Sequence, residues 1–425
     1  MSSEVEEFFA ATAAAHPRCF WLDGGGARDW SGSRSIVGHL EDDDVSLTFH
    51  AAAGEVRRHA GGTTTVVGED IFEVLGRELA AGADEAQWFG WFGYASRRDV
   101  AARPDPHLPD AVWMCPSRIR AFDHPPTPSP PLVEPGDTAT ASLVDSVEPP
   151  PSDYAHAFDR VQEALRSGDS YEVNLTHRVA VHSKLSPAQV YTRLRRLNPA
   201  PYAGFLQHDV EGARGWLLSS SPERYALIGA DRTIETKPIK GTTPRSPDPE
   251  VDAEQRARLG ADVKFRAENL MIVDLLRNDV SMVCAPGTVE VPALMQVESY
   301  PSVHQLVSTV RGTLREDVTT IEALHALFPA GSMTGAPKVR TMQVIDEVEA
   351  TPRGVYAGAF GWIAADGRAD MGVVIRSLTT DGGGTWQVGS GGGITVRSQV
   401  GEEWAEAAWK ASRVLAALRV GADRE

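Results

Sequence analysis

Residues 358–396, GAFGWIAADGRADMGVVIRSLTTDGGGTWQVGSGGGITV, indicate most directly which fold the chain adopts. Apolar and polar residues alternate through much of this stretch, and the alternating segments are separated by Asp366-Gly367 and by the glycines at 382–384. Asp-Gly and Gly-Gly pairs between alternating segments are typical of tight hairpins, which join antiparallel strands. The stretch therefore predicts antiparallel β-structure.

Upstream of this stretch, helical and strand patterns follow one another without a regular order. Residues 153–169, DYAHAFDRVQEALRSGD, have the apolar period of a helix, whereas residues 170–183, SYEVNLTHRVAVHS, alternate as a strand does. Residues 224–239, RYALIGADRTIETKPI, are also rich in strand-forming types. We expect an α+β fold with large antiparallel sheets, and the pattern does not favour a regular βαβ order with a parallel sheet.

The first third of the chain has a different pattern of apolar and polar residues. From Met1 to about Phe122, short apolar segments separated by glycines and charged turns predict strands, with one amphipathic helix near residues 70–82. Residues 124–152 are rich in proline and poor in apolar side chains, which predicts a surface linker. The predicted organisation is a β-rich N-terminal region at 1–123, the linker, and a larger region at 153–425.

Composition and charge exclude several classes of function. The 425 residues are 42% hydrophobic and 23% charged, and the formal net charge is −17. No dense run of Lys and Arg offsets this charge, so we expect neither nucleic acid nor an anionic membrane as a partner. An anionic small substrate would need local cations or a metal ion.

The cysteines and the N-terminus bear on location. Three scattered cysteines lack zinc-binding or disulfide spacing. The N-terminal residues are acidic where a secretory signal is basic, and no apolar run reaches the roughly 18 to 20 residues that span a bilayer. The expected location is the cytoplasm.

Two glycine-rich strings invite a nucleotide-binding interpretation, but neither fits one. GSMTGAPK, residues 331–338, has Pro337 where a P-loop needs glycine, and Val339 follows where Ser or Thr is required. GSGGGI, residues 389–394, continues into further β pattern instead of opening a helix. The glycines either let the chain approach a small ligand and donate amides to a carboxylate, or form a plain turn.

The segment KFRAENLMIVDLLRND, residues 264–279, is apolar on nearly every side of a helix, which predicts a helix that runs through the interior. Its charges then need partners. Asp274 can pair with Arg277 or Asn278 one turn further on, a structural arrangement. Glu268 is a candidate either for binding a cation or for a structural ion pair.

Two further charged positions have competing interpretations. The last helix, residues 401–420, carries Glu406 and Lys410 at i,i+4, which local pattern interprets as a solvent-exposed salt bridge. Lys240 follows a β-like stretch and precedes a Gly-Thr-Thr-Pro turn, which places an amine at the end of a strand. A surface lysine is the alternative. The apolar stripe of the last helix is predicted at Trp404, Ala408, Ala411, Leu415 and Leu418.

Six strings, in this order, resemble the chorismate-utilising enzymes, which include anthranilate, aminodeoxychorismate, isochorismate and salicylate synthases. They are SSSPERY, ETKPIKGTTPR, AENLMIVDLLRND, FPAGSMTGAPKVRTMQVIDEVE, GVYAGAFGWI and GSGGGIT. The resemblance covers residues 153–418, and CFWLDGGGARDWSGSRSIVG, residues 19–38, looks like the opening sheet of the anthranilate and aminodeoxychorismate branch. The implied fold is a two-lobed antiparallel β-sandwich with helices outside.

The resemblance implies a role for each matched residue. Glu268 and Glu406 match ligands of Mg²⁺, a hard cation that takes oxygen ligands. Glu223 matches the general acid that protonates the departing C4 hydroxyl of chorismate, a role that requires a protonated carboxyl. The positions matched to the substrate's carboxylates are Lys410, Arg376, Tyr356 and the amides of Gly391, Gly392 and Gly393, and those matched to its ring are His304 and Ser332.

Two positions distinguish the branches of the family. Enzymes that add water at C2 carry a lysine base where this chain has Glu172, so the resemblance does not favour isochorismate or salicylate synthesis. Lys240 stands where anthranilate synthases have a small residue and where aminodeoxychorismate synthases have their nucleophile. The implied reaction is attack of Lys240 on C2, loss of the C4 hydroxyl, and displacement of the lysine when ammonia attacks C4. This attack requires a lysine with a lowered pKa.

The implied partner is a separate glutamine amidotransferase that supplies ammonia, because none of the cysteines lies in a glutaminase nucleophile context. The alternatives are anthranilate synthase component I and a non-catalytic paralogue that binds chorismate or tryptophan. The chain departs from the branch at three positions. Glu172 replaces a Gln, Phe265 stands where a polar residue is typical, and Arg397 stands where an Asp is common.

Overall fold

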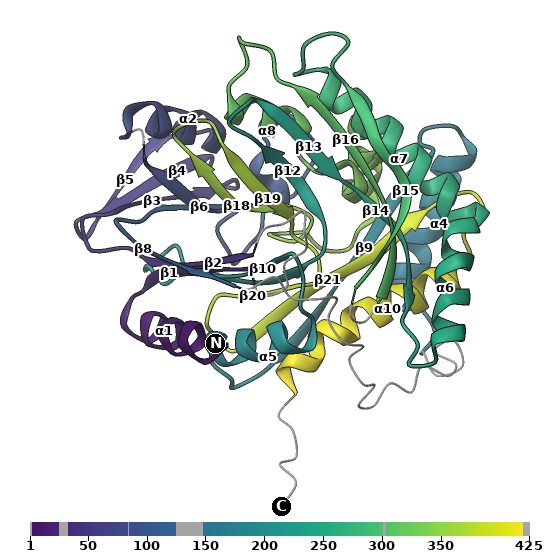
Figure 1. Ribbon diagram of the computed structural model, residues 1–425, viewed down its shortest axis with the longest axis horizontal. Coiled ribbons are helices and arrows are strands. Elements are labelled where there is room, and N and C mark those ends of the chain that lie inside the picture. Colours follow the sequence, from purple (N-terminus) through teal and green to yellow (C-terminus); the bar gives the residue numbers. More distant parts are fainter. Residues whose placement is uncertain (1, 25–32, 84, 125–147, 301–302, 420–425) are drawn as a thin grey trace, which may run out of the picture.

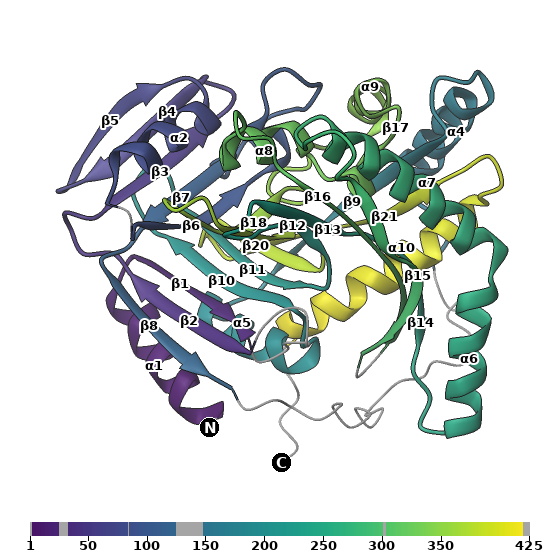
Figure 2. The same cartoon turned by 45° about the horizontal axis from the view of Figure 1, so that its top comes forward.

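The computed structural model describes residues 2–24, 33–83, 85–124, 148–300 and 303–419. Within these ranges, two large antiparallel sheets face each other and helices cover their outer faces (Figures 1 and 2). We call them sheet A and sheet B. The predicted α+β class and antiparallel β-sandwich are therefore confirmed.

Sheet A has nine strands in the described residues. Their spatial order is β17 (Gly335–Ala336), β9 (Glu172–His182), β21 (Thr385–Ile394), β20 (Ser377–Thr380), β11 (Gly215–Ser221), β10 (Tyr202–His208), β1 (Arg18–Asp23), β2 (Arg34–His39) and β8 (Arg118–Asp123).

Sheet B has twelve strands in the same ranges, and one of them, β15 (Glu290–Ser299), pairs with β16 beside the main order. That order is β14 (Ile239–Pro244), β16 (Val303–Thr313), β13 (Thr233–Lys237), β12 (Arg224–Ile228), β19 (Ala369–Val373), β18 (Ala359–Ala364), β6 (Gln87–Phe92), β7 (Ala111–Cys115), β3 (Val45–His50), β4 (Glu55–Ala60) and β5 (Thr63–Gly68).

Strand β1 shows how the layers form. Phe20 faces sheet B, and its ring stacks on that of Phe89 with 4.0 Å between the centroids. Its neighbours Cys19 and Trp21 belong to a second apolar cluster, in which they pack with Phe9 of the first helix. Because successive side chains of a strand point to opposite faces, a strand that is apolar at every position is covered on both sides. The layers are therefore helix, sheet, sheet and helix.

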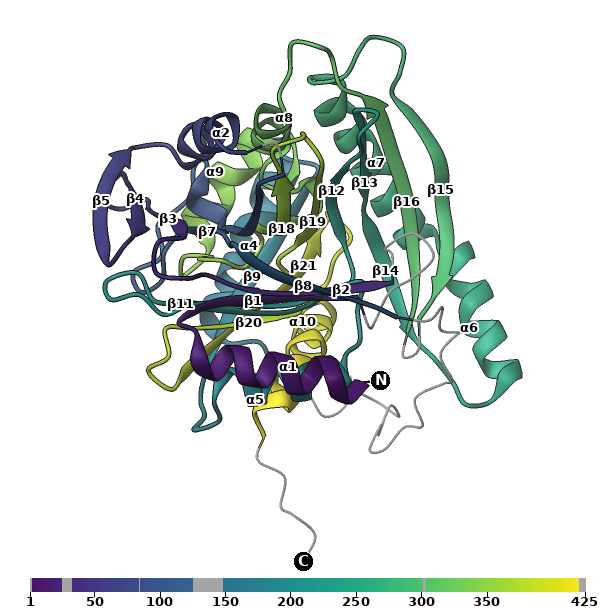
Figure 3. The ribbon, with the colours of Figure 1, turned by 60° about the vertical axis from the view of Figure 1, so that its left-hand side comes forward.

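The helices divide between the two outer faces, as Figure 3 shows. Sheet A is covered by α1 (Ser2–Ala15), α5 (Pro187–Leu197) and α10 (Val400–Leu415). Sheet B is covered by α2 (Ile71–Ala81), α7 (Val263–Ser281) and α8 (Thr320–Leu327). Helices α4 (Ser152–Arg166) and α9 (Lys338–Val348) pack on the β9 end of sheet A, and α6 (Pro249–Ala261) lies beside β14, β15 and β16. No helix in the described part of the chain is both long and apolar enough to cross a membrane.

Several local predictions are confirmed. The predicted hairpins connect β18 to β19 and β20 to β21, and Gly367, Gly382 and Gly384 adopt the positive φ angles that such turns need. Helix α2 begins after Asp70, whose side chain accepts from two backbone N–H groups of the first turn. The helix predicted near 153–169 and the strand predicted after it are α4 and β9.

Three other predictions are wrong. Residues 2–15 form a helix, not a strand, because Val5, Phe9 and Thr12 recur at helical spacing and bury one face against sheet A. Helix α7 does not run through the interior. It lies on the outer face of sheet B, so Leu270 is 54% exposed and the predicted Asp274–Arg277 pair is on the surface. The apolar stripe of α10 is also displaced from the prediction, with Ala407, Ala411 and Val414 at its centre.

The N-terminal region does not form a sheet of its own. Strand β1 pairs with β10 in sheet A, and β6 pairs with β18 in sheet B, so residues before and after the predicted linker complete the same two sheets. Residues 125–147 of that linker lie outside the described residues. The predicted linker therefore separates two parts of the sequence, but the strands of both parts belong to the same two sheets.

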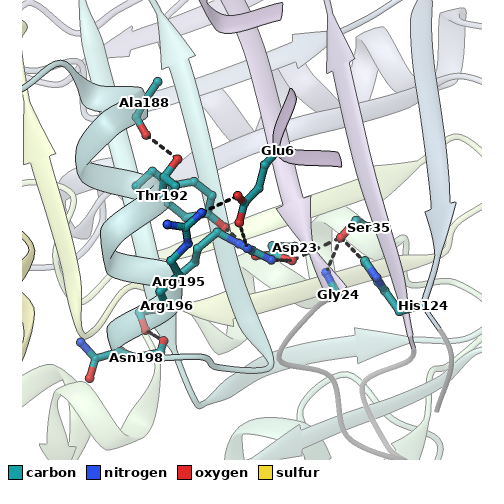
Figure 4. A network of polar contacts seen from close by, with 12 residues as sticks. Glu6, Asp23, Gly24, Ser35, His124, Ala188, Thr192, Arg195, Arg196 and Asn198 are labelled. Atoms are coloured by element: carbon teal, nitrogen blue, oxygen red, sulfur yellow. Dashed lines mark hydrogen bonds and ion pairs between the residues drawn. The ribbon is translucent and has the colours of Figure 1, made fainter. Parts of the chain in front are cut away.

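A polar network joins α1 and α5 to β1, as Figure 4 shows. The Arg195 guanidinium donates to Asp23 at 2.6 Å and to Glu6 at 2.6 Å. Arg196 also donates to Glu6, and Ser35 donates to Asp23. The Asp23 side chain is 2% exposed and that of Arg195 is 14% exposed, so these charges are removed from water and held by each other.

Candidate active site

One cavity collects residues from both sheets and from helices α7 and α10, close to where β14, β21 and these helices meet (Figure 2). All of the predicted site residues except His304 line it. They are Lys240, Glu223, Glu268, Glu406, Ser332, Tyr356, Arg376, Gly391, Gly392, Gly393 and Lys410. The fold therefore brings together residues separated by up to about half of the chain, as the resemblance implied.

Lys240 lies within strand β14, not at the entrance of a turn. The pairing of β14 with β16 shifts register between Ile239 and Thr242, and Gly241 in the bulge has a φ of +91°. A bulge re-aims the side chains beside it, and a glycine adopts this φ without strain. The predicted Gly-Thr-Thr-Pro turn is thus the continuation of a strand, and the Lys240 side chain is 10% exposed.

Glu172, at the start of β9, is the partner of Lys240. The Lys240 Nζ donates to Glu172 Oε1 in a buried ion pair, and the other oxygen, Oε2, is buried without a hydrogen-bond partner. Burial lowers the pKa of Lys240, but Glu172 and Glu268 more than offset it, so the pKa lies above its ordinary value. The expected lowered lysine pKa is therefore wrong for this state, in which the amine is an ammonium.

Glu223 occupies the connection between β11 and β12. Ser332, in the 3-10 helix η3 (Gly331–Met333), donates to its Oε1 at 2.5 Å. Burial raises the pKa of Glu223 to about 7, although the Ser332 hydrogen bond and the nearby Lys240 and Lys410 act in the opposite direction. A carboxyl with this pKa is protonated in a substantial fraction of molecules at neutral pH, as a general acid must be.

Glu268 faces the cavity from α7. Burial raises its pKa to about 7, which Lys240 opposes and Glu172 reinforces. Its Oε1 is buried and has no hydrogen-bond partner in the structure. An unpartnered buried carboxylate oxygen is a suitable ligand for a hard cation. Among the described residues, no three His, Cys, Asp or Glu side chains are close enough to hold a metal by themselves, so a cation here would need ligands from water or substrate.

Glu406 and Lys410 pair along α10 at 2.6 Å, as their spacing predicted. The pair borders the cavity, which the interpretation as a surface salt bridge did not include. Lys410 lowers the pKa of Glu406 against the effect of burial, and the same ammonium donates to the backbone oxygen of Gly391 at 3.0 Å. Glu406 is thus kept ionised, as a metal ligand must be.

The glycines of β21 present backbone amides to the cavity. Gly391 pairs with Thr176 and Gly393 with Asn174 in the ladder with β9. Both partners send their N–H groups away from β21, Thr176 to Glu349 and Asn174 to the backbone oxygen of Thr334. Gly391 and Gly393 therefore point their own N–H groups away from β9, on the cavity side. Gly392 points the other way, toward β9, so only two of the three predicted amides are available to a ligand.

Tyr356 and Arg376 form another wall. The guanidinium of Arg178 lies 4.7 Å from the centroid of the Tyr356 ring, on the side where β9 passes. Arg376 has a positive φ of 51° and lies over Trp409. Burial, and then the nearby Arg413, lower the pKa of Arg376 to about 10, which leaves it a cation at neutral pH.

His304 is placed outside the cavity lining, so the geometry does not support its expected contact with the ring. Its two ring nitrogens contact Ser299 at 2.8 Å and Asp252 at 3.1 Å. The adjacent residue Gln305 lines the cavity instead, and its Oε1 is buried without a hydrogen-bond partner. Gln305 takes the place expected for His304 because neighbouring residues of β16 point to opposite faces of the sheet.

The other departures from the family pattern have different environments. Phe265 lines the cavity and packs over Gly241, where an added Cβ would lie 2.8 Å from its ring. Arg397 is exposed and is not among the lining residues. Sequence reasoning missed Asn174 and Gln305, which also line the cavity, although the alternation of β9 could have placed Asn174 on the same face as Glu172.

The cavity holds the Lys240 amine and two carboxyls with pKa values of about 7, Glu223 and Glu268. Glu268 has an oxygen without a hydrogen-bond partner, and Glu406 adds an ionised carboxylate. The cavity's cations, Lys240, Lys410 and Arg376, offset the negative charge of the whole chain locally. This set can bind a small anion, protonate a leaving group and supply a nitrogen nucleophile.

Comparison with known proteins agrees with this geometry. Residues 18–416 match the chorismate binding enzyme family. An aminodeoxychorismate synthase of Streptomyces pristinaespiralis is 39% identical over 98% of this chain and 64% of its own length. The aminodeoxychorismate synthase component 1 of Escherichia coli K12 is 43% identical over 62% of this chain and 57% of its own length.

A solved structure, anthranilate synthase component I from Streptococcus pneumoniae TIGR4, superposes with a TM-score of 0.72 at 24% identity. The match covers 91% of this chain and 92% of that one, and it shows a shared fold. The chain belongs to the chorismate-binding enzyme family. It spans less than two thirds of the length of the two aminodeoxychorismate synthases above.

Proposed function

We propose that this chain converts chorismate and ammonia to 4-amino-4-deoxychorismate. The observation that carries the proposal is the buried amine of Lys240 in the cavity lining, together with the Glu223 carboxyl whose pKa is about 7. Two relatives named aminodeoxychorismate synthase support the same reaction. One of them aligns with 98% of this chain and the other with 62% of it.

Mg²⁺ fits the carboxylates of the cavity. Glu268, with its unpartnered buried oxygen, and Glu406, kept ionised by Lys410, would hold it. When bound, the ion supplies positive charge for the ring carboxylate of the substrate. Lys410, Arg376 and the N–H groups of Gly391 and Gly393 receive the remaining negative charge.

The chain's own residues account for each bond change. The lone pair of a neutral Lys240 forms a bond to C2 as the ring double bonds shift and the C4–O bond breaks. Glu223 gives its proton to the departing hydroxyl, which leaves as water. Ammonia then forms a bond to C4, the double bonds shift back, and the electron pair of the C2–N bond returns to Lys240. Glu223 recovers its proton from the new ammonium at C4.

The covalent step is tested by incubating the chain with chorismate and Mg²⁺ in the absence of ammonia, followed by denaturation and mass analysis. We expect an adduct of chorismate minus water on Lys240, abolished by Lys240→Ala and retained by Lys237→Ala. Lys237 is the matched control because it lies in β13, the preceding strand of the sequence, outside the cavity lining, and pairs with Glu298. An adduct on another residue, or turnover by Lys240→Ala at the native rate, contradicts the proposal.

The source of ammonia is the second part of the proposal. We propose a separate glutamine amidotransferase as the partner, because the component 1 designation of the Escherichia coli relative denotes one part of an assembly. The isolated chain is then expected to use ammonium salts and to leave glutamine unchanged. Turnover of glutamine by the purified chain contradicts this assignment.

A further inference from the structure

Glu172 lies directly behind the cavity lining, against Lys240, and the proposed reaction does not yet use it. Its side chain is 1% exposed, and one oxygen accepts the hydrogen bond from Lys240. The other oxygen is buried and has no partner. A buried carboxylate with one unsatisfied oxygen is costly, so a position that keeps it invites a functional explanation.

The backbone around the Glu172–Lys240 pair carries glycines where a side chain would collide with the pair. Gly393 lies beside both charges, and a Cβ there would be 2.1 Å from Glu172 Oε1 and 2.8 Å from Lys240 Nζ. On the other side, the backbone oxygen of Glu172 lies 1.9 Å from where a Cβ of Gly335 would be. Gly393 thus leaves room for the carboxylate to meet the amine, and Gly335 lets β17 approach the backbone of Glu172.

The proposed reaction needs Lys240 as a neutral amine, whereas the structure holds it as an ammonium. The acidic groups that face it are Glu172 from β9, Glu268 from α7, Glu223 from the β11–β12 connection and Glu406 from α10, and all of them favour the charged form. Glu268 and Glu406 are the expected metal ligands, and Glu223 is the expected acid, which must itself remain protonated. Glu172 accepts a hydrogen bond from the amine, and the proposed reaction gives it no other role.

Resting on the function proposed above, we propose that Glu172 is the catalytic base of the lysine, accepting the proton of the Lys240 ammonium through their direct hydrogen bond as chorismate fills the cavity. The N–H bond of Lys240 breaks, the O–H bond of Glu172 forms, and the lone pair released on nitrogen makes the bond to C2. When ammonia displaces the lysine, Glu172 returns the proton to the amine, so the pair begins and ends the cycle with the same number of protons. Exclusion of water favours this transfer because a neutral acid and amine tolerate a dry cavity better than two charges do.

This assignment makes a prediction about pH that a merely structural ion pair does not. In the native chain the pair shares one proton, so the fraction in the neutral form is independent of pH while that single proton is kept. In Glu172→Gln, Lys240 loses its proton to solvent, so the fraction of free amine rises by about tenfold per pH unit below the lysine pKa. The window below the Glu223 pKa of about 7 separates the two cases, because Glu223 is protonated there in both.

The test follows adduct formation in single turnovers without ammonia, at saturating chorismate and Mg²⁺, from about pH 5 to about pH 6. We expect a flat rate for the native chain and a rise of about tenfold for Glu172→Gln. Glu298→Gln, which alters the neighbouring Lys237–Glu298 pair outside the cavity lining, is the matched control and should remain flat. If native and Glu172→Gln chains share one pH dependence, the assignment is overturned.

A second variant covers the case in which Glu172→Gln fails to fold. Glu172→Ala leaves space beside the lysine, and added formate should then accelerate adduct formation in that variant and not in the native chain. No acceleration by formate in a folded Glu172→Ala chain overturns the assignment. If the native chain forms no Lys240 adduct at all, the proposed function fails as well, whereas an adduct with unchanged pH dependence in the variants removes only the role of Glu172.

Discussion

Glu223 and Glu268 show how burial prepares single residues for their roles. Both carboxyls have pKa values raised to about 7, mainly by burial, yet their surroundings differ. Glu223 receives a hydrogen bond from Ser332, whereas Glu268 has an oxygen without a partner. A satisfied carboxyl near neutrality suits proton transfer, and an unsatisfied one suits a cation.

The Ser332–Glu223 hydrogen bond gives a prediction about pH. Since this bond lowers the pKa of Glu223, Ser332→Ala should raise that pKa further. The acid then stays protonated to higher pH, so the alkaline fall in kcat, expected above about pH 7 in the native chain, should move upward. A kcat–pH profile at saturating chorismate checks this, and a downward movement of the alkaline fall contradicts it.

Removal of the Glu268 carboxylate should weaken Mg²⁺ binding. In Glu268→Gln, we expect the Mg²⁺ concentration for half-maximal activity to increase by at least about tenfold, because one of two protein ligands loses its charge. Titration of turnover with MgCl₂ measures this directly. Glu290→Gln, which alters a surface pair with Arg311, is the control, and an equal effect in both variants contradicts the assignment.

The motif strings predicted which residues line the cavity, but not all of their contacts. Lys240 and Glu172 meet across 68 positions of sequence, on strands of different sheets. Local pattern cannot reveal such a pair. The proposed attack of Lys240 on C2 requires a lowered lysine pKa, whereas the carboxylate neighbour raises it. His304 was misplaced for a similar reason, since its face of β16 is fixed by pairing with β14 and β15.

At the scale of elements, strand β21 does the most to shape the site. It pairs with β9 along its whole length but with β20 only at Gln387 and Val388, so its glycine end is free to face the cavity. The bulge of β14 brings Lys240 to the same place. Hairpins at Gly367 and Gly382 were predictable because turn chemistry is local, whereas the bulge depends on its partner strand.

Gly393→Ala tests the close approach of these strands. The added methyl would lie 2.1 Å from Glu172 Oε1 and 2.8 Å from Lys240 Nζ, so it must displace the pair. We expect the Lys240 adduct to form at least about tenfold more slowly while the fold persists, since the cost of overpacking is typically about 1–3 kcal/mol. Rates from mass analysis and a thermal melt provide the two readouts.

The control for this variant is Gly401→Ala at the start of α10, where no atom lies within 4 Å of the added Cβ. It should keep the native rate of adduct formation. A native rate in Gly393→Ala as well would show that the glycine is not needed to admit the Glu172–Lys240 pair.

At the scale of the whole molecule, the predicted N-terminal region completes both sheets. Strands β1 and β6 are interior members of sheets A and B, and Phe20 and Phe89 stack between them. The composition of residues 124–152 predicted a linker, but strand pairing across that segment is long-range and left no local signal. The sandwich was therefore predictable as a class, whereas its interleaved connection was not.

The network of Figure 4 should contribute to the stability of the whole chain. Arg195→Ala removes the guanidinium that donates to the buried Asp23 at 2.6 Å, so we expect a loss of about 3–5 kcal/mol in the free energy of unfolding. Arg196→Ala, whose side chain is 62% exposed, should lose at most about 1 kcal/mol. Urea unfolding of both variants measures the difference, and equal losses contradict a role for burial.

The identity of the product shows whether the chain aminates chorismate through Lys240. The purified chain is incubated with chorismate, Mg²⁺ and ammonium, and the product is identified by mass. We predict 4-amino-4-deoxychorismate, which retains the enolpyruvyl group because Lys240 occupies C2 until ammonia reaches C4. Release of pyruvate together with anthranilate by the chain alone would contradict the account and assign it to the anthranilate-forming branch.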